Sequence, residues 1–154
     1  MNVVTVPPII RLAATSDITV MVDLLAQLFA IESDFCAEPA KQATGLKELL
    51  QCGNSAVLIA ESAGRAVGMV TVQVLISTAE GGRVGLIEDL VVCEDWRGRG
   101  LGGKLLRAAG DWACERGLTR LQLLADRDNA AALAFYRNQG WDGTSLIALR
   151  KHMR

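Results

Sequence analysis

The chain has 154 residues, a length typical of a single domain that buries its own hydrophobic core. Apolar residues make up 51% of it and charged residues 21%, a balance that excludes an intrinsically disordered protein. The formal net charge of -1 provides no general basic field, which argues against a nucleic-acid-binding protein, so any anion must be recognised locally.

The first residues lack the pattern of a signal peptide. The segment MNVVTVPPIIRL has neither a cationic start nor a long apolar stretch. No apolar run in the chain approaches the roughly 18 residues of a membrane-spanning helix. We therefore expect a soluble, cytoplasmic protein without membrane contact.

The first third of the chain predicts one strand and two helices. A short strand starts at Ile9 and is followed by the cluster Thr15-Ser16-Asp17, whose side chains are typical of helix N-caps. Apolar residues at helical spacing predict a helix over Ile18 to Phe29. A second helix is expected from Pro39 to Leu50.

From Asn54 onward the hydrophobic period is that of strands. The runs SAVLIAE and AVGMVTVQVLI are joined by the turn Ser62-Ala63-Gly64-Arg65, which predicts a hairpin. A third run, VGLIEDLVV, follows after a loop. The three strands are expected to form an antiparallel meander.

The remainder alternates helices with strands. In chain order we expect a helix from Gly100 to Arg116, a strand from Arg120 to Ala125, a helix from Asn129 to Asn138 and a last strand from Ser145 to Arg150. The complete order, β-α-α-β-β-β-α-β-α-β, predicts a mixed sheet with helices packed on it.

The cysteines give no sign of a disulfide or a metal site. They lie far apart in sequence, without a CxxC pair or a Cys/His ligand spacing, at Cys36, Cys52, Cys93 and Cys114. We expect buried, reduced thiols and no metal. The chain's one histidine, His152, is expected in a solvated tail.

The segment WRGRGLGGKLL is rich in glycines and cations, and three phosphate-binding patterns compete for it. A dinucleotide-binding GxGxxG motif starting at Gly98 is weak, because five residues separate the glycine from the preceding strand. A P-loop needs Ser or Thr after Lys104 to hold magnesium, and Leu105 stands there.

The third pattern, R/Q-x-x-G-x-G/A, fits Arg97, Gly100 and Gly102. Glycines let backbone N–H groups approach a pyrophosphate, and the start of the following helix adds unpaired donors and a positive dipole end. Arg97, Arg99 and Lys104 supply positive charge. The alternative is a glycine-rich turn with a solvated cationic helix start.

With IEDLVVCEDWRGRGLGGKLL and DRDNAAALAFYRNQGW together, the chain resembles the GNAT superfamily of acyl-CoA-dependent N-acyltransferases. The resemblance implies an α+β fold of one domain over 1–154, with a core of about 9–151. It implies a mixed, mostly antiparallel sheet of about six to seven strands with helices on both faces. It also implies a splay between two strands that the cofactor fills, and it is compatible with a homodimer.

By the same resemblance, acetyl-CoA is the cosubstrate. Arg97 to Gly102 would hold its pyrophosphate, and the backbone of the preceding strand would align its pantetheine arm. Asn129 matches a cofactor-contacting asparagine, although it is equally suited to capping a helix. The implied cofactor-binding residues are Leu90, Val91, Val92, Arg97, Gly98, Arg99, Gly100, Leu101, Gly102 and Asn129.

Acetyl transfer requires a base for the amine and an acid for the thiolate. The resemblance assigns Tyr136 as the acid, where a core aromatic is the alternative. Glu88 and Asp89 lie inside an apolar strand, where a buried charge is costly without a purpose. We predict Glu88 as the base, directly or through water; Asp89 replaces it if a bulge reverses the faces of the strand.

The acceptor amine is suggested by the segment AIESDFCAE between the first two helices. Glu32, Asp34 and Glu38 lie around Phe35 in this segment, and an acidic lip of this kind favours a small cationic amine, unless it is only a solvated loop. Two alternatives remain open: a protein or peptide N-acetyltransferase, and a non-catalytic regulator that binds acyl-CoA.

Overall fold

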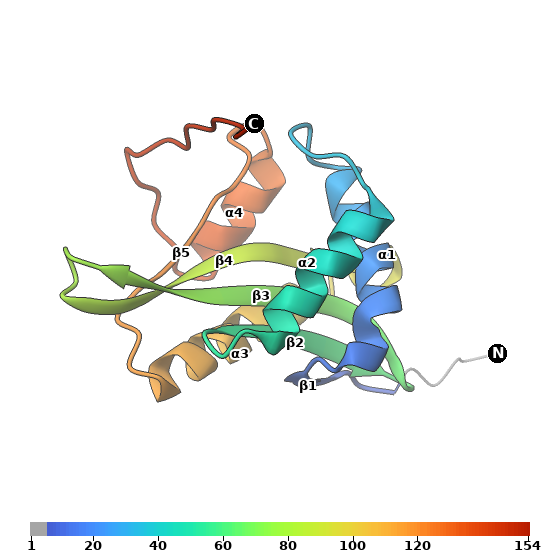
Figure 1. Ribbon diagram of the computed structural model, residues 1–154. Helices are drawn as coiled ribbons and strands as arrows, with labels where there is room; N and C mark the ends of the chain where they lie inside the picture. Colours follow the sequence, from blue (N-terminus) through green and yellow to red (C-terminus); the bar gives the residue numbers. More distant parts are fainter. Residues whose placement is uncertain (1–5) are drawn as a thin grey trace. The chain divides into compact units, whose positions relative to one another are not determined.

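The computed structural model describes residues 6–154. By its internal contacts the chain divides into two compact units, one ending at Leu123 and one beginning at Leu124 (Figure 1). The first unit holds the sheet and three α-helices, and the second holds one α-helix and the C-terminal segment.

The first unit is built on a five-stranded sheet in the order β1-β2-β3-β4-β5. Neighbouring strands are antiparallel except β4 and β5, which are parallel. The predicted meander and the mixed sheet are therefore confirmed, but the sheet has five strands among the described residues instead of the six to seven expected. They are β1 (Ile9–Leu12), β2 (Ser55–Ser62), β3 (Arg65–Ser77), β4 (Gly82–Val92) and β5 (Leu121–Leu123).

The turn between β2 and β3 shows why its sequence predicts a hairpin. Ser62 pairs with Arg65, so the loop has two residues, Ala63 and Gly64. Both have positive φ angles, 49° and 77°, as a turn that follows the right-handed twist of the strands requires. Glycine adopts this conformation without strain, whereas Ala63 adopts it at a cost.

Helices cover both faces of this sheet (Figure 1). Helices α1 (Ile18–Phe29) and α2 (Pro39–Gln51) lie on one face, where Met21, Leu46 and Met69 are fully buried. Helix α3 (Leu101–Glu115) lies on the other, and Leu105 packs so closely that a Cβ atom on Gly68 would come within 3.1 Å of its Cδ1 atom. In the described part of the chain no helix has the length and apolarity needed to cross a membrane.

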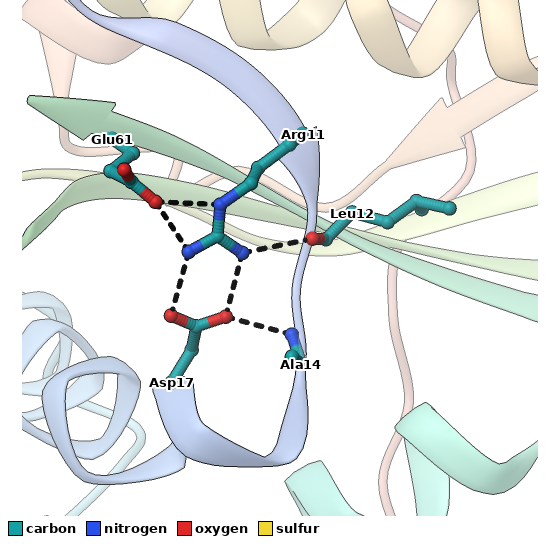
Figure 2. Close-up of polar contacts among 5 residues, drawn as sticks. All are labelled: Arg11, Leu12, Ala14, Asp17 and Glu61. Atoms are coloured by element: carbon teal, nitrogen blue, oxygen red, sulfur yellow. Dashed lines mark hydrogen bonds and ion pairs between the residues drawn. The ribbon is translucent and has the colours of Figure 1, made fainter. Parts of the chain in front are cut away.

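A partly buried ion-pair network ties β1 to β2 at the start of α1 (Figure 2). Arg11 donates from Nε to Glu61 Oε2 at 2.6 Å and from Nη1 to Asp17 Oδ2 at 2.8 Å. Asp17 also accepts a 2.7 Å hydrogen bond from the N–H of Ala14. Asp17 belongs to the short 3-10 helix η1 (Thr15–Asp17), so this carboxylate fixes where α1 begins.

A β-bulge interrupts the pairing of β3 with β4. Val70 pairs with Leu90 and Val72 with Ile87, so Glu88 and Asp89 together face Thr71. A bulge of this kind bends the strand and changes the direction of its side chains.

The parallel pairing of β4 with β5 is short. It covers Gly85 to Ile87 of β4 and ends immediately before the bulge. From Glu88 to Val92, β4 therefore pairs with β3 and not with β5. The strand separation implied by the family resemblance begins at this point.

The second unit departs from prediction at its C-terminal end. Helix α4 (Ala130–Asn138) forms as expected, but residues 145–150 form no strand. Leu146, Ile147 and Leu149 are 77%, 69% and 89% exposed. Alternating apolar residues form a strand only beside a partner edge, and this segment pairs with no strand among residues 6–154.

The expectation of buried cysteines is wrong for three of the four. All four thiols are free, with Cys93 half-buried and Cys36, Cys52 and Cys114 exposed. Cys36 lies in the connection between α1 and α2, Cys52 caps α2, and Cys114 lies near the end of α3. These three side chains face solvent, and the spacing of cysteines in the sequence does not reveal this.

Candidate active site

The glycine-rich segment forms the connection from β4 into α3. After β4, the short 3-10 helix η2 (Glu94–Trp96) leads into a turn in which Gly98 and Gly100 have φ angles of 71° and 76°. Helix α3 then begins at Leu101, with Gly100 as its N-cap and no side chain capping it. The first N–H groups of an α-helix have no acceptor within the helix, so they point toward whatever binds at this end.

The space around this turn suits a bulky anion. A Cβ atom placed on Gly98 or Gly100 would meet no other heavy atom within 4 Å. The positive end of the α3 dipole and the cationic side chains of Arg97 and Arg99 lie at the same turn. Backbone donors, positive charge and missing side chains together fit a pyrophosphate group.

The two arginines are held in different ways. Arg97 donates from Nε to the carbonyl oxygen of Val92 at 3.0 Å, which ties the turn to the end of β4. The guanidinium of Arg99 lies over the Trp96 ring, 5.1 Å from its centroid. Neither arginine is paired with a carboxylate in these contacts, so both keep their charge available for an anion.

The competing phosphate-binding patterns do not fit the geometry. η2 separates the last residue of β4 from the glycines, whereas a dinucleotide-binding glycine follows its strand directly. Leu105, at the position where a P-loop holds magnesium, is fully buried against the sheet.

The β-bulge gives Glu88 and Asp89 different surroundings. Glu88 is exposed, whereas Asp89 is half-buried. The N–H of Asp89 donates to Thr71 Oγ1 at 3.1 Å, and the Thr71 hydroxyl donates to Asp89 Oδ2 at 3.4 Å. Burial, the charge of Glu88 and the charge of Glu32 raise the pKa of Asp89 to about 6, against the lowering effect of Thr71.

The edge of β4 beyond the bulge presents backbone groups away from β3. Cys93 donates its N–H to Val67 on β3 at 2.9 Å. In an antiparallel pair the direction of these groups alternates along the strand. Val91 therefore also bonds toward β3, while the backbone groups of Leu90 and Val92 point to the opposite edge. Of the three predicted backbone contacts, these two face the open side.

The segment between α1 and α2 brings Glu32 close to Asp89. The charge of Glu32 is one of the causes of the raised pKa of Asp89. Phe35 lies against Phe29, with ring centroids 5.4 Å apart, and is 45% exposed. Asp34 is exposed, and no effect of its charge on Asp89 is among those causes.

In the second unit, Asn129 and Tyr136 lie at the start and in the last turns of α4. Asn129 accepts a 3.0 Å hydrogen bond from the N–H of Ala132 through its side-chain oxygen, so it caps the helix. Tyr136 is half-buried, with its ring 5.2 Å from that of Phe135 and 6.2 Å from that of Trp141. Asn129 thus caps its helix, as one alternative from the sequence held, whereas Tyr136 is a half-buried aromatic and not a fully buried core residue.

Thr71 is a candidate functional residue that the sequence pattern did not indicate. This side chain is fully buried and contacts Asp89 through both its hydroxyl proton and its lone pairs. The available signal was a hydroxyl residue in the middle of the apolar run AVGMVTVQVLI. A buried polar group in such a run requires a partner, and the partner lies on the neighbouring strand.

Comparison with known proteins gives a family and a fold. The model of the Acetyltransferase (GNAT) family matches residues 25–141. An uncharacterized N-acetyltransferase of Bacillus subtilis, YhfO, is 32% identical over 136 residues, covering 86% of this chain and 89% of that protein.

Solved structures share the arrangement over nearly the whole chain. A structure described as a transcriptional regulator from Bacillus halodurans is 28% identical, with a TM-score of 0.83 and coverage of 95% of this chain and 99% of that one. The aminoglycoside N-acetyltransferase AAC(6')-Iy, solved in complex with CoA, has a TM-score of 0.83 at 17% identity, with coverage of 99% and 98%. At that identity the second likeness shows the fold alone.

Proposed function

Because the chain belongs to the GNAT acetyltransferase family, we propose that it transfers an acetyl group from acetyl-CoA to the primary amine of a small cationic acceptor. The observation that carries this proposal is the glycine turn at the start of α3, beside a strand whose edge opens at a pair of carboxylates. Both substrates would be held together, so that orientation supplies much of the rate.

Acetyl-CoA supplies the acetyl group as a thioester when it is bound. In this proposal the backbone N–H groups from Gly98 to Gly102 hold the pyrophosphate, and Arg97 and Arg99 add charge. The exposed backbone edge at Leu90 and Val92 aligns the pantetheine arm, and an N–H of this edge polarises the carbonyl. Leu101 and Asn129 also belong to the set implied by the family resemblance, whereas the backbone of Val91 bonds toward β3 and is left out of this proposal.

The amine attacks only as the neutral base, so a carboxylate must take its ammonium proton. The sequence predicted Glu88. The half-burial and raised pKa of Asp89 favour Asp89 as the proton acceptor, with Glu88 as the alternative. A pKa of about 6 leaves Asp89 ionised near neutral pH but basic enough to accept a proton.

Tyr136 is proposed as the proton donor to the departing thiolate. Support comes from the family resemblance of the segment around it, an Asn followed by Tyr seven positions later and then by Gly-Trp. No protein nucleophile enters this scheme, and the four free cysteines have no assigned role in it.

A cationic acceptor is supported by the charges around Asp89. Glu32 and Glu88 both act on that carboxyl, so the local field is negative despite the near-neutral chain. An exposed Phe35 beside these charges would contact the carbon skeleton of the acceptor.

A regulator that binds acyl-CoA without turnover is the second candidate. It is favoured by the 28% identity to a structure described as a transcriptional regulator. The two candidates share the cofactor site and differ in whether an amine is acetylated.

The deciding experiment has two stages. Calorimetry with acetyl-CoA tests the cofactor site, and absence of binding heat would remove both candidates. Release of free thiol is then followed with polyamines, aminoglycosides, lysyl peptides and neutral amines. Thiol release with the cationic small amines supports the enzyme, preference for the peptides indicates a protein acetyltransferase, and binding without turnover indicates the regulator.

A further inference from the structure

We propose that Thr71 is a positioning residue, whose hydroxyl holds the Asp89 carboxylate in the orientation that accepts the substrate proton. This inference rests on the proposed function, because it assigns Thr71 a role through Asp89. Thr71 itself would touch neither substrate, since it is fully buried in β3.

The β-bulge explains why Asp89 and Thr71 come into contact. Two residues of β4, Glu88 and Asp89, stand opposite Thr71, so the regular ladder is broken there. The N–H of Asp89 donates to Thr71 Oγ1 at 3.1 Å. The hydroxyl of Thr71 thus holds the backbone of β4 at the bulge.

The same hydroxyl reaches the side chain of Asp89. Having accepted the N–H, it donates its one proton toward Asp89 Oδ2 at 3.4 Å. One buried group therefore fixes both the backbone and the carboxylate of a single residue. The second oxygen, Oδ1, takes no part in either contact.

The charges around Asp89 make this contact consequential. Glu88 on the same strand and Glu32 from the segment before α2 raise its pKa, and the hydroxyl of Thr71 lowers it. Helix α1, which packs on this face, carries Asp23 as its titratable residue, and that side chain is exposed. β5 carries no titratable side chain, and the one charged residue of β3, Arg65, lies at its far end.

The test compares Thr71→Val with Thr71→Ser. Valine keeps the shape of threonine and removes the hydroxyl, whereas serine keeps the hydroxyl and removes the methyl group. We expect the acid limb of the pH profile of kcat/KM to move up by about 0.5–1 pH unit in Thr71→Val, the equivalent of one lost hydrogen bond. In Thr71→Ser the limb should stay where it is in the natural protein.

Two further readouts separate positioning from loss of structure. In Thr71→Val, kcat should fall about tenfold while the KM for acetyl-CoA stays within twofold. The carboxyl carbon of Asp89, assigned by its absence in Asp89→Asn, should titrate at a higher pH in NMR spectra of Thr71→Val. If valine does not fold at this position, Thr71→Ala removes the same hydroxyl and should give the same shifts.

The proposal is overturned if Asp89 titrates identically in the natural protein and in the variants without a hydroxyl. It is also overturned if Thr71→Ser shifts the limb as far as Thr71→Val. Failure of the proposed function looks different, because no amine would then release thiol in any variant, while the NMR titration would still report on Thr71 and Asp89.

Discussion

At Asp89 the protein keeps a carboxyl group where its ionised form is disfavoured. Its pKa of about 6 lies above the ordinary 3.8 because of burial, Glu88 and Glu32. The folded state thus holds the proton more tightly than the unfolded chain. Stability that Asp89 provides is fully present below about pH 4 and is lost as the pH rises through 6.

Asp89→Asn is therefore expected to be more stable than the natural protein at pH 7.5, by about 1–3 kcal/mol. The gain should shrink as the pH falls and vanish near pH 4, where both side chains are neutral. Urea unfolding at a series of pH values measures it. The control is Asp111→Asn, an exposed carboxylate on α3 that is not among the charges acting on Asp89 and is expected to change stability by less than about 0.5 kcal/mol. Equal stability of Asp89→Asn and the natural protein at pH 7.5 would contradict the burial argument.

The two glycines at either end of α3 offer a matched pair of substitutions. Gly100 at its start and Gly117 just beyond its end have φ angles of 76° and 70°, with open space around both. Alanine at either position should cost about 1–2 kcal/mol of stability, because a side chain disfavours that conformation.

Only Gly100 of this pair lies in the proposed cofactor site. Gly100→Ala should also weaken acetyl-CoA binding by about tenfold or more, since its Cβ atom stands where the proposed pyrophosphate approaches. Gly117→Ala should leave the dissociation constant unchanged. Calorimetric titration of both variants checks this, and equal affinities would speak against binding at the glycine turn.

Among the elements, the junction of β1, η1 and β2 depends on one arginine between two carboxylates (Figure 2). The hydrogen bond from Arg11 holds the pKa of Asp17 below its ordinary value, against the effect of burial. A lowered pKa means that the stability from Asp17 is present above about pH 4 and is lost as the pH falls through the folded-state pKa.

Asp17→Asn should destabilise the protein by about 1–3 kcal/mol at neutral pH, less than a fully buried pair because Arg11 is partly exposed. The loss should diminish under acidic conditions, where Asp17 itself becomes protonated. Thermal unfolding at pH 7 and pH 3 measures the loss of stability under the two conditions. Glu38→Gln is the control, because it breaks the exposed pair with Lys41 and should cost under about 0.5 kcal/mol. A similar loss of stability in Asp17→Asn and Glu38→Gln would contradict a stabilising role for the Arg11 network.

The elements also show what the sequence could and could not predict. The helix over Ile18–Phe29 and the hairpin at Ala63-Gly64 follow from local periodicity and turn chemistry, and both are confirmed. The strand predicted at Ser145 to Arg150 failed because strand formation depends on a partner edge, which is not a local property. The exposure of Cys114 depends on which face of α3 meets the sheet, and that too is set by packing.

The candidate site likewise contains features that the sequence predicts and features that it does not. The glycine turn was recognisable because its residues are contiguous and their spacing reflects backbone geometry. The choice between Glu88 and Asp89 stayed open in the sequence, because it depends on a bulge that shifts the register by a single residue and involves both strands. Thr71 lies 18 positions before Asp89, so only the sheet pairing connects them.

At the scale of the whole molecule, the two candidate functions require different sets of residues. The cofactor turn and the carboxylates belong to the first, while Asn129 and Tyr136 belong to the second. A protein that only binds acyl-CoA needs the turn and has no use for a proton donor. An enzyme needs both, which makes the two functions separable by substitution.

Tyr136→Phe makes this separation. The ring and its packing beside Phe135 and Trp141 are kept, so folding and acetyl-CoA affinity should stay within twofold of the natural protein. Loss of the hydroxyl removes the proposed donor to the thiolate, and kcat should fall by about 10²–10³. Steady-state thiol release with a cationic amine, together with calorimetry, measures both quantities. Gly100→Ala should show the opposite pattern, with weakened binding and less change in kcat at saturating acetyl-CoA. Full turnover in Tyr136→Phe would exclude this tyrosine as the acid, because the phenyl ring has no proton to give.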